Sequence, residues 1–113
     1  MSKPLVVSLP HRLGRAEATR RLQGGLTRVA AQFPVLAADE ENWTKEHDCD
    51  RMSFRVRALG QSVSGLVDVR EEDVRLELHL PLFLRAFAER ATETIQRHGR
   101  LLLEKGGRPG GAG

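Results

Sequence analysis

The feature that most constrains the fold is a run of alternating apolar and polar residues between Met52 and Leu80, interrupted by two short turn signals. Alternation with a period of two is typical of β-strands that bury one face. The apolar face predicted from this alternation comprises Met52, Phe54, Val56, Ala58, Val63, Val67, Val69, Val74, Leu76 and Leu78. The pattern therefore predicts three consecutive antiparallel strands with a shared apolar face.

The turns fix how these strands pair. Residues 60–61, Gly-Gln, suit a type II′ turn because glycine accepts the positive φ that its first position requires. This turn pairs Phe54 with Val67, and a second turn at residues 70–73 pairs Val67 with Leu76. Both turns place the apolar residues on the same face, whereas a slip of one residue would expose all of them.

Two stretches have the periodicity of amphipathic helices. Residues 11–33 carry an apolar stripe, and Gly24 and Gly25 within them predict a kink or close packing on the sheet. The opposite face of this helix is interpreted as a solvated, mostly basic surface; it holds Arg15, Glu17, Arg21 and Arg28. Residues 82–105 predict a second helix, which Pro81 can open because proline is tolerated in a first turn.

The remaining segments are shorter. Residues 4–10, PLVVSLP, predict an edge strand. Residues 35–37 and Trp43 favour another strand before the hairpins, and residues 44–50 predict an exposed acidic turn. Residues 106–113, GGRPGGAG, predict a flexible tail.

Together these elements predict a single α+β domain over residues 1–105, in the order β-α-β-β-β-β-α. Two helices would cover one face of a curved antiparallel sheet of four to five strands, a two-layer sandwich similar to a reduced helix-grip fold. Gly65 lies where a large apolar side chain is expected on that face. We interpret it as a bend or a close helix approach, with a ligand cavity as the alternative.

Composition excludes several classes of function. The chain has 113 residues, a net charge of +3 and 4% aromatic residues without Tyr, so it lacks a stacking platform for single-stranded nucleic acid. No apolar run approaches the ~20 residues of a membrane span. The single cysteine, Cys49, cannot form an internal disulfide and favours a reducing cytoplasm.

The sequence carries no catalytic signature. Residues 47–50, His-Asp-Cys-Asp, cluster in one turn without the second ligand pair that a zinc site requires. No glycine-rich nucleotide motif or nucleophile elbow occurs, and no pair of carboxylates lies on the apolar face. We therefore expect no catalytic residue, no metal and no cofactor. His11 is expected to bond within the turn before the first helix, and His98 to lie at the core edge.

Three segments resemble a known family. They are residues 9–22, LPHRLGRAEATRRL; residues 61–69, QSVSGLVDV; and residues 82–105. Across residues 5–105 the chain resembles the small bacterial proteins called polyhydroxyalkanoic acid system proteins or granule-region proteins. It departs from them at Pro81, where glycine is usual. The resemblance implies association with storage-polyester metabolism and supplies no catalytic residue.

The resemblance leads to a hypothesis of a non-enzymatic accessory protein in the cytoplasm, bound to a polyhydroxyalkanoate granule or to a granule-associated protein. The candidate surface is the wide apolar start of the last helix, formed by Leu82, Phe83, Leu84 and Phe87. The alternative is a carrier of a lipophilic or acyl ligand, in which Gly65 hollows the space between sheet and helix. The oligomeric state stays open.

Overall fold

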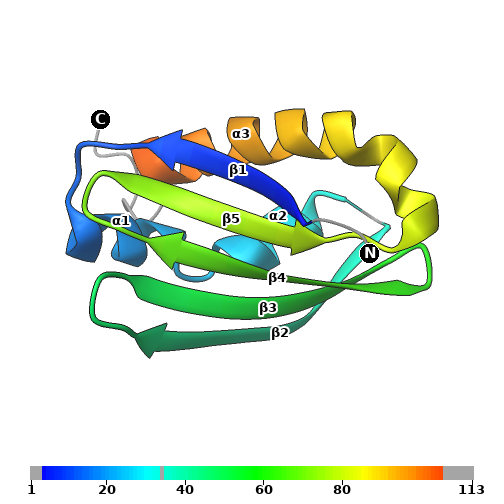
Figure 1. Cartoon of the computed structure of the whole chain (residues 1–113), viewed down its shortest axis with the longest axis horizontal. Coiled ribbons are helices and arrows are strands. Elements are labelled where there is room, and N and C mark those ends of the chain that lie inside the picture. The colour runs from blue at the N-terminus through cyan, green and yellow to red at the C-terminus, as the bar shows by residue number, and fades with distance from the viewer. Residues whose placement is uncertain (1–3, 34, 106–113) are drawn as a thin grey trace.

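The computed structural model describes residues 4–33 and 35–105. The elements, in chain order, are β1 (Leu5–Pro10), α1 (Arg15–Leu22), α2 (Gly25–Ala31), β2 (Leu36–Lys45), β3 (Asp50–Ala58), β4 (Gln61–Val69), β5 (Asp73–His79), the 3₁₀-helix η1 (Leu82–Phe87) and α3 (Ala88–Lys105). In Figure 1 the sheet forms one layer and the helices lie behind it. The predicted α+β architecture is confirmed, whereas the tail predicted at residues 106–113 lies outside the described residues.

The five strands form one open antiparallel sheet in the order β1-β5-β4-β3-β2. Its apolar face is buried against side chains from the helices, including Ala18, Leu84 and Leu103. The large apolar side chains of the strands that are buried are Val7, Leu9, Met52, Phe54, Val56, Val63, Val69 and Val74. The shared apolar face predicted from the alternating pattern is therefore confirmed.

The β4–β5 register agrees with the prediction, because Val67 pairs with Leu76. The predicted β3–β4 turn is wrong. The turn residues are Leu59 and Gly60, whose φ angles of 53° and 79° are both positive, as a type I′ turn requires.

The corrected turn moves the β3–β4 pairing by two residues, so that Phe54 lies opposite Gly65 instead of Val67. Side chains on a strand alternate with a period of two, and a two-residue shift keeps each of them on its own face. The predicted buried face is therefore correct even though the predicted turn is wrong.

The helix predicted over residues 11–33, with a kink or close packing at Gly24 and Gly25, is in fact two helices, because the chain is fully interrupted between Leu22 and Gly25. Gly24, between them, has a left-handed φ of 77°, which interrupts the helix at little cost for glycine. Gly25 begins α2 and is buried. A Cβ atom at Gly25 would lie 2.8 Å from the side chain of Leu102, so the missing side chain lets α3 approach α2.

The segment before the hairpins contains a longer strand than predicted. β2 covers ten residues and has a bulge between Ala38 and Glu40. The exposed acidic turn predicted at residues 44–50 is correspondingly shorter. Cys49 and Asp50 are buried, contrary to the prediction, because β3 begins at Asp50 and directs its side chain beneath α1.

Candidate functional site

The structure separates the four apolar residues predicted to form a partner surface. Leu82 is 84% exposed and Phe87 is 50% exposed, whereas Leu84 is only 6% exposed and packs in the core with Phe54 and Val56. The side chain of Phe83 lies outside what the structure describes. Leu82 and Phe87 are thus available to a partner, and Leu84 serves the fold.

The local geometry around Pro81 explains this separation. Pro81, at φ −58° and ψ 156°, precedes η1, and its carbonyl accepts a hydrogen bond of 2.9 Å from the Leu84 amide. A 3₁₀-helix has three residues per turn, so Leu82 and Leu84 project in different directions from it. With Leu84 directed into the core, Leu82 is left on the surface.

Two further exposed apolar residues lie at the same end of the molecule. Val35 and Leu59 are each 56% exposed, and they adjoin Leu36 and Ala58, which pair across β2 and β3. Figure 1 places the α2–β2 connection, the β3–β4 turn and η1 at one end of the long axis. We call the group Val35, Leu59, Leu82 and Phe87 the apolar tip.

Sequence reasoning missed half of the apolar tip. The turn predicted at residues 60–61 leaves Leu59 outside it, and the strand predicted at residues 35–37 includes Val35. The sequence gives only a weak signal for Leu59: Gly60 can occupy the second position of a two-residue turn, but the first position prefers Asn, Asp or Gly. No local pattern, however, relates Val35 to η1.

The space above Gly65 is filled by a side chain. A Cβ atom at this position would lie 2.5 Å from the Phe54 ring and 2.5 Å from the Glu77 carbonyl oxygen. The aromatic ring of the opposite strand therefore covers the glycine, a known way to pair glycine within a sheet. This contact explains Gly65 without a ligand and without a close helix approach.

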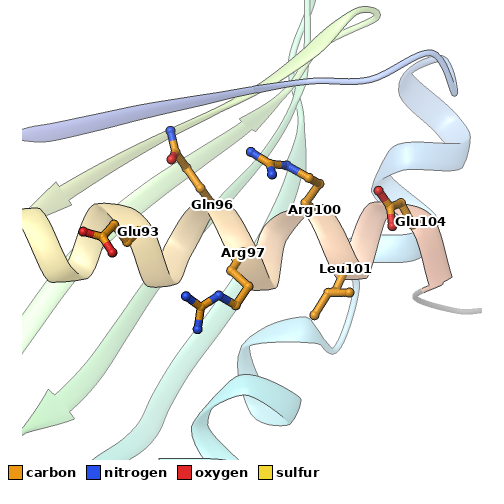
Figure 2. A pocket seen from close by; sticks show the side chains of 6 residues that line it. All are labelled: Glu93, Gln96, Arg97, Arg100, Leu101 and Glu104. Carbon is orange, nitrogen blue, oxygen red and sulfur yellow. The ribbon is translucent and has the colours of Figure 1, made fainter.

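Two hollows border α3 in the described part of the chain. The larger, of about 380 Å³, runs along the outer side of α3 and is lined by charged and polar residues of that helix alone, with one leucine (Figure 2): Glu93, Gln96, Arg97, Arg100, Leu101 and Glu104. The smaller, of about 140 Å³, lies between Pro4, Leu5, Leu80, Arg85 and Ala88. Neither includes Gly65, and the smaller one is below the ~300 Å³ at which ligand pockets usually begin.

A buried polar cluster closes the end of the molecule opposite to the apolar tip. The Arg15 Nε donates to Asp50 Oδ1 at 3.0 Å, and the Thr19 hydroxyl donates to Asp50 Oδ2 at 2.6 Å. Burial alone would raise the pKa of Asp50, but the hydrogen bonds from Thr19 and Arg15 outweigh it and lower the pKa. The cluster fastens α1 to the start of β3.

The same guanidinium holds the acidic turn. Arg15 also donates to the carbonyl oxygens of Glu46, His47 and Cys49 at 2.7, 3.2 and 2.9 Å. Burial raises the pKa of the Cys49 thiol, which disfavours the reactive thiolate. Among the described residues, no group of three or more His, Cys, Asp or Glu side chains lies close enough together to hold a metal ion.

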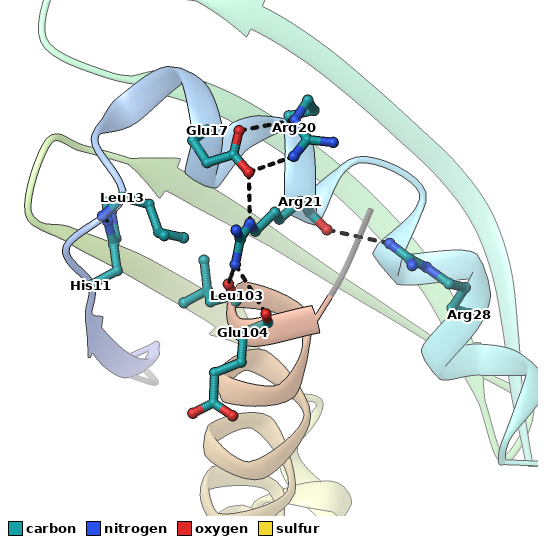
Figure 3. Close-up of polar contacts among 8 residues, drawn as sticks. All are labelled: His11, Leu13, Glu17, Arg20, Arg21, Arg28, Leu103 and Glu104. Carbon is teal, nitrogen blue, oxygen red and sulfur yellow. Dashed lines mark hydrogen bonds and ion pairs between the residues drawn. The ribbon is translucent and has the colours of Figure 1, made fainter. Parts of the chain in front are cut away.

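A second arginine joins α1 to the end of α3 (Figure 3). Arg21 donates to Glu17 at 2.7 Å and to the carbonyl oxygens of Leu103 and Glu104, which lie in the last turn of α3. Hydrogen bonds from Arg20 and Arg21 lower the pKa of Glu17 to about 2. The interpretation of this helix face as merely solvated is wrong for Arg15 and Arg21.

Two histidines occupy structural positions. The Leu13 amide donates to His11 Nδ1 at 3.2 Å, and His11 Nε2 lies 2.9 Å from the Arg70 carbonyl oxygen, so the expected bonding in the entry turn is confirmed. His98 is half-buried and packs edge-on against Phe33, with 5.4 Å between ring centroids. Its expected place at the core edge is confirmed.

Comparison with known proteins places the chain in a family. No curated protein and no solved structure matches it. The family model described as "Putative polyhydroxyalkanoic acid system protein" matches residues 5–103, which span all five strands and most of α3. Within the described residues, no helix combines the length and the apolar character needed to cross a membrane. The chain belongs to the polyhydroxyalkanoic acid system protein family.

Proposed function

We propose that this protein is a non-catalytic component of the polyhydroxyalkanoate storage system, located in the cytoplasm, which attaches to a granule or to a granule protein. The attachment residues are Leu82 and Phe87. Family membership supports the association with this storage system. The observation that carries the attachment is the exposure of Leu82, of whose surface 84% faces solvent in a segment directly beside the core.

Exposure of this kind leaves binding energy available. Burying one Leu or Phe side chain fully contributes about 1.5–3 kcal/mol. Single exposed apolar residues are common on protein surfaces, but neighbouring ones tend to mark contact sites. Leu82 and Phe87 lie at the two ends of the same short 3₁₀-helix and project from it in different directions, so a partner must extend around this helix to contact both.

The alternative of a lipophilic-ligand carrier has less support. It requires an open space at Gly65, and the Phe54 ring fills that space. The hollow of about 140 Å³ next to Leu80 and Ala88 is small for an acyl ligand.

The test is co-sedimentation with polyhydroxyalkanoate granules purified from a producing bacterium. We expect the protein to appear in the granule fraction, and the double variant Leu82→Ser/Phe87→Ser to stay mostly in the supernatant. Leu101→Ser is the matched control, because Leu101 is exposed near the far end of α3 (Figure 2). Recovery of the unaltered protein only in the supernatant, with no granule protein bound, would contradict the proposal.

A further inference from the structure

We infer that the whole apolar tip is one contact surface, and that its occupant is the uncharged polyester of the granule itself. This inference rests on the proposed function and narrows it to one partner. Val35, Leu59, Leu82 and Phe87 come from three separate segments, which the fold brings to one end of the molecule (Figure 1). Four of the six large apolar residues that are exposed in the described chain lie there.

The conformation of Leu59 is independent support. Its φ of 53° is in the left-handed region, where the side chain crowds the backbone, and turns of this type prefer Asn, Asp or Gly. Among the described residues, no other non-glycine residue has a positive φ. A leucine that is both strained and 56% exposed contributes nothing evident to the fold, and strained residues concentrate at contact sites.

The size and shape of the tip disfavour a protein partner. A stable protein–protein interface covers about 800 Å² on each partner. Perpendicular to its long axis the whole molecule extends 31 × 23 Å, and the tip is a fraction of that cross-section. None of its four residues lines either of the two hollows described above. Projecting apolar residues fit a broad surface in which they can be buried.

The charges around the tip disfavour lipid headgroups. Residues 32–39, 57–62 and 79–90 carry three Arg, one Asp, one Glu and one His. Arg57 forms an ion pair with Asp39 at 3.5 Å, which uses one of these arginines. Surfaces that recognise anionic lipids typically gather about four to eight Lys or Arg. A nearly balanced rim fits a surface without charge, and an aliphatic polyester is such a surface.

The experiment compares three surfaces: native granules, polyester particles emulsified from purified poly(3-hydroxybutyrate) without protein or lipid, and phosphatidylglycerol vesicles. We expect the protein to bind the bare polyester and the native granules, and the vesicles at least tenfold more weakly. Leu59→Asn should weaken binding to bare polyester by about five- to tenfold, since part of one buried leucine is lost.

Leu101→Asn is the control and should bind like the unaltered protein. Circular dichroism verifies that each variant is folded, and Leu59→Asn is chosen because asparagine tolerates the turn conformation. An unchanged affinity of folded Leu59→Asn for bare polyester would overturn the inference.

The surfaces also separate this inference from the proposed function. Binding to native granules without binding to bare polyester would overturn the inference and leave the proposed function standing, with a granule protein or lipid as the partner. Vesicle binding as strong as polyester binding would likewise overturn it. Failure to bind any of the three surfaces would contradict both the inference and the proposed function.

Discussion

The two ends of the long axis differ in chemistry: at one end polar groups bond to one another within the protein, and at the other end apolar side chains are exposed. At both ends, strand turns and helix starts meet and leave groups that need a partner. At the end formed by α1 and the β2–β3 turn, Arg15, Asp50 and Thr19 satisfy one another inside the protein. At the other end, Leu59 and Leu82 face solvent.

The two ends also differ in whether their groups already have partners within the protein. In the described part of the chain, every buried side-chain nitrogen and oxygen has a hydrogen-bond partner. The polar end therefore needs nothing from outside. The apolar tip exposes side chains whose burial would be favourable only if another surface covered them, and this difference supports the contact proposed there.

The largest loss of stability is expected from removing the Asp50 carboxylate at the polar end, which is the end formed by α1 and the β2–β3 turn. Asp50→Ala leaves the partly buried Arg15 guanidinium and the Thr19 hydroxyl without their acceptor, which should lower the free energy of unfolding by about 3 kcal/mol. Urea denaturation measures the change. Asp48→Ala, at an exposed position two residues earlier, should cost almost nothing. A loss of equal size for both variants would mean that the polar end is not fastened by Asp50.

A second substitution tests the packing between the two ends. Gly65→Ala inserts a methyl group 2.5 Å from the Phe54 ring and the Glu77 carbonyl, and should cost about 2 kcal/mol in urea denaturation. Gly99→Ala meets side-chain atoms of Leu9 and no backbone carbonyl, so its cost should be smaller. Equal stability of Gly65→Ala and the unaltered protein would reveal an open space above Gly65 and revive the carrier hypothesis.

A third substitution, at the apolar tip, should stabilise the folded protein. Leu59→Asn relieves the strain of a leucine at positive φ and should raise the free energy of unfolding by about 1 kcal/mol while binding weakens. Leu82→Asn lacks this relief and should leave stability nearly unchanged. A clear destabilisation by Leu59→Asn would assign Leu59 to the fold instead of to a partner.

The smallest expected effect is a pH dependence of the free energy of unfolding, which arises from carboxylates at the polar end. The pKa of Glu17 falls from 4.5 to about 2 in the folded protein, chiefly through hydrogen bonds from Arg20 and Arg21. A lowered folded-state pKa contributes stability above the unfolded value, and this contribution is lost as pH falls from 4.5 towards 2. Asp50, whose pKa is also lowered, acts in the same direction below its ordinary 3.8.

Unfolding measured between pH 5 and about 2 should therefore show a shallower loss of stability for Glu17→Gln than for the unaltered protein. Leu82→Asn should follow the unaltered curve, because the apolar tip has no part in these hydrogen bonds. An equally shallow curve for Leu82→Asn would show that the two ends are coupled.

For the candidate site, the sequence predicted those parts that depend on neighbours in the chain. The apolar start of the last helix was visible in Leu82 and Phe87, but the burial of Leu84 was not, because the 3₁₀ geometry after Pro81 decides it. The contribution of Leu59 required the correct turn, and that of Val35 required the pairing of β2 with β3.

The alternating pattern was sufficient to predict the buried face of the sheet. Alternation repeats every two residues, so Phe54, Val67 and Leu76 share a face whichever even register is chosen. Which residues lie opposite one another, and which remain exposed, depends on how the segments pack in three dimensions. The Phe54 ring over Gly65 and the gathering of the apolar tip both depend on contacts between segments distant in sequence, and no local periodicity encodes them.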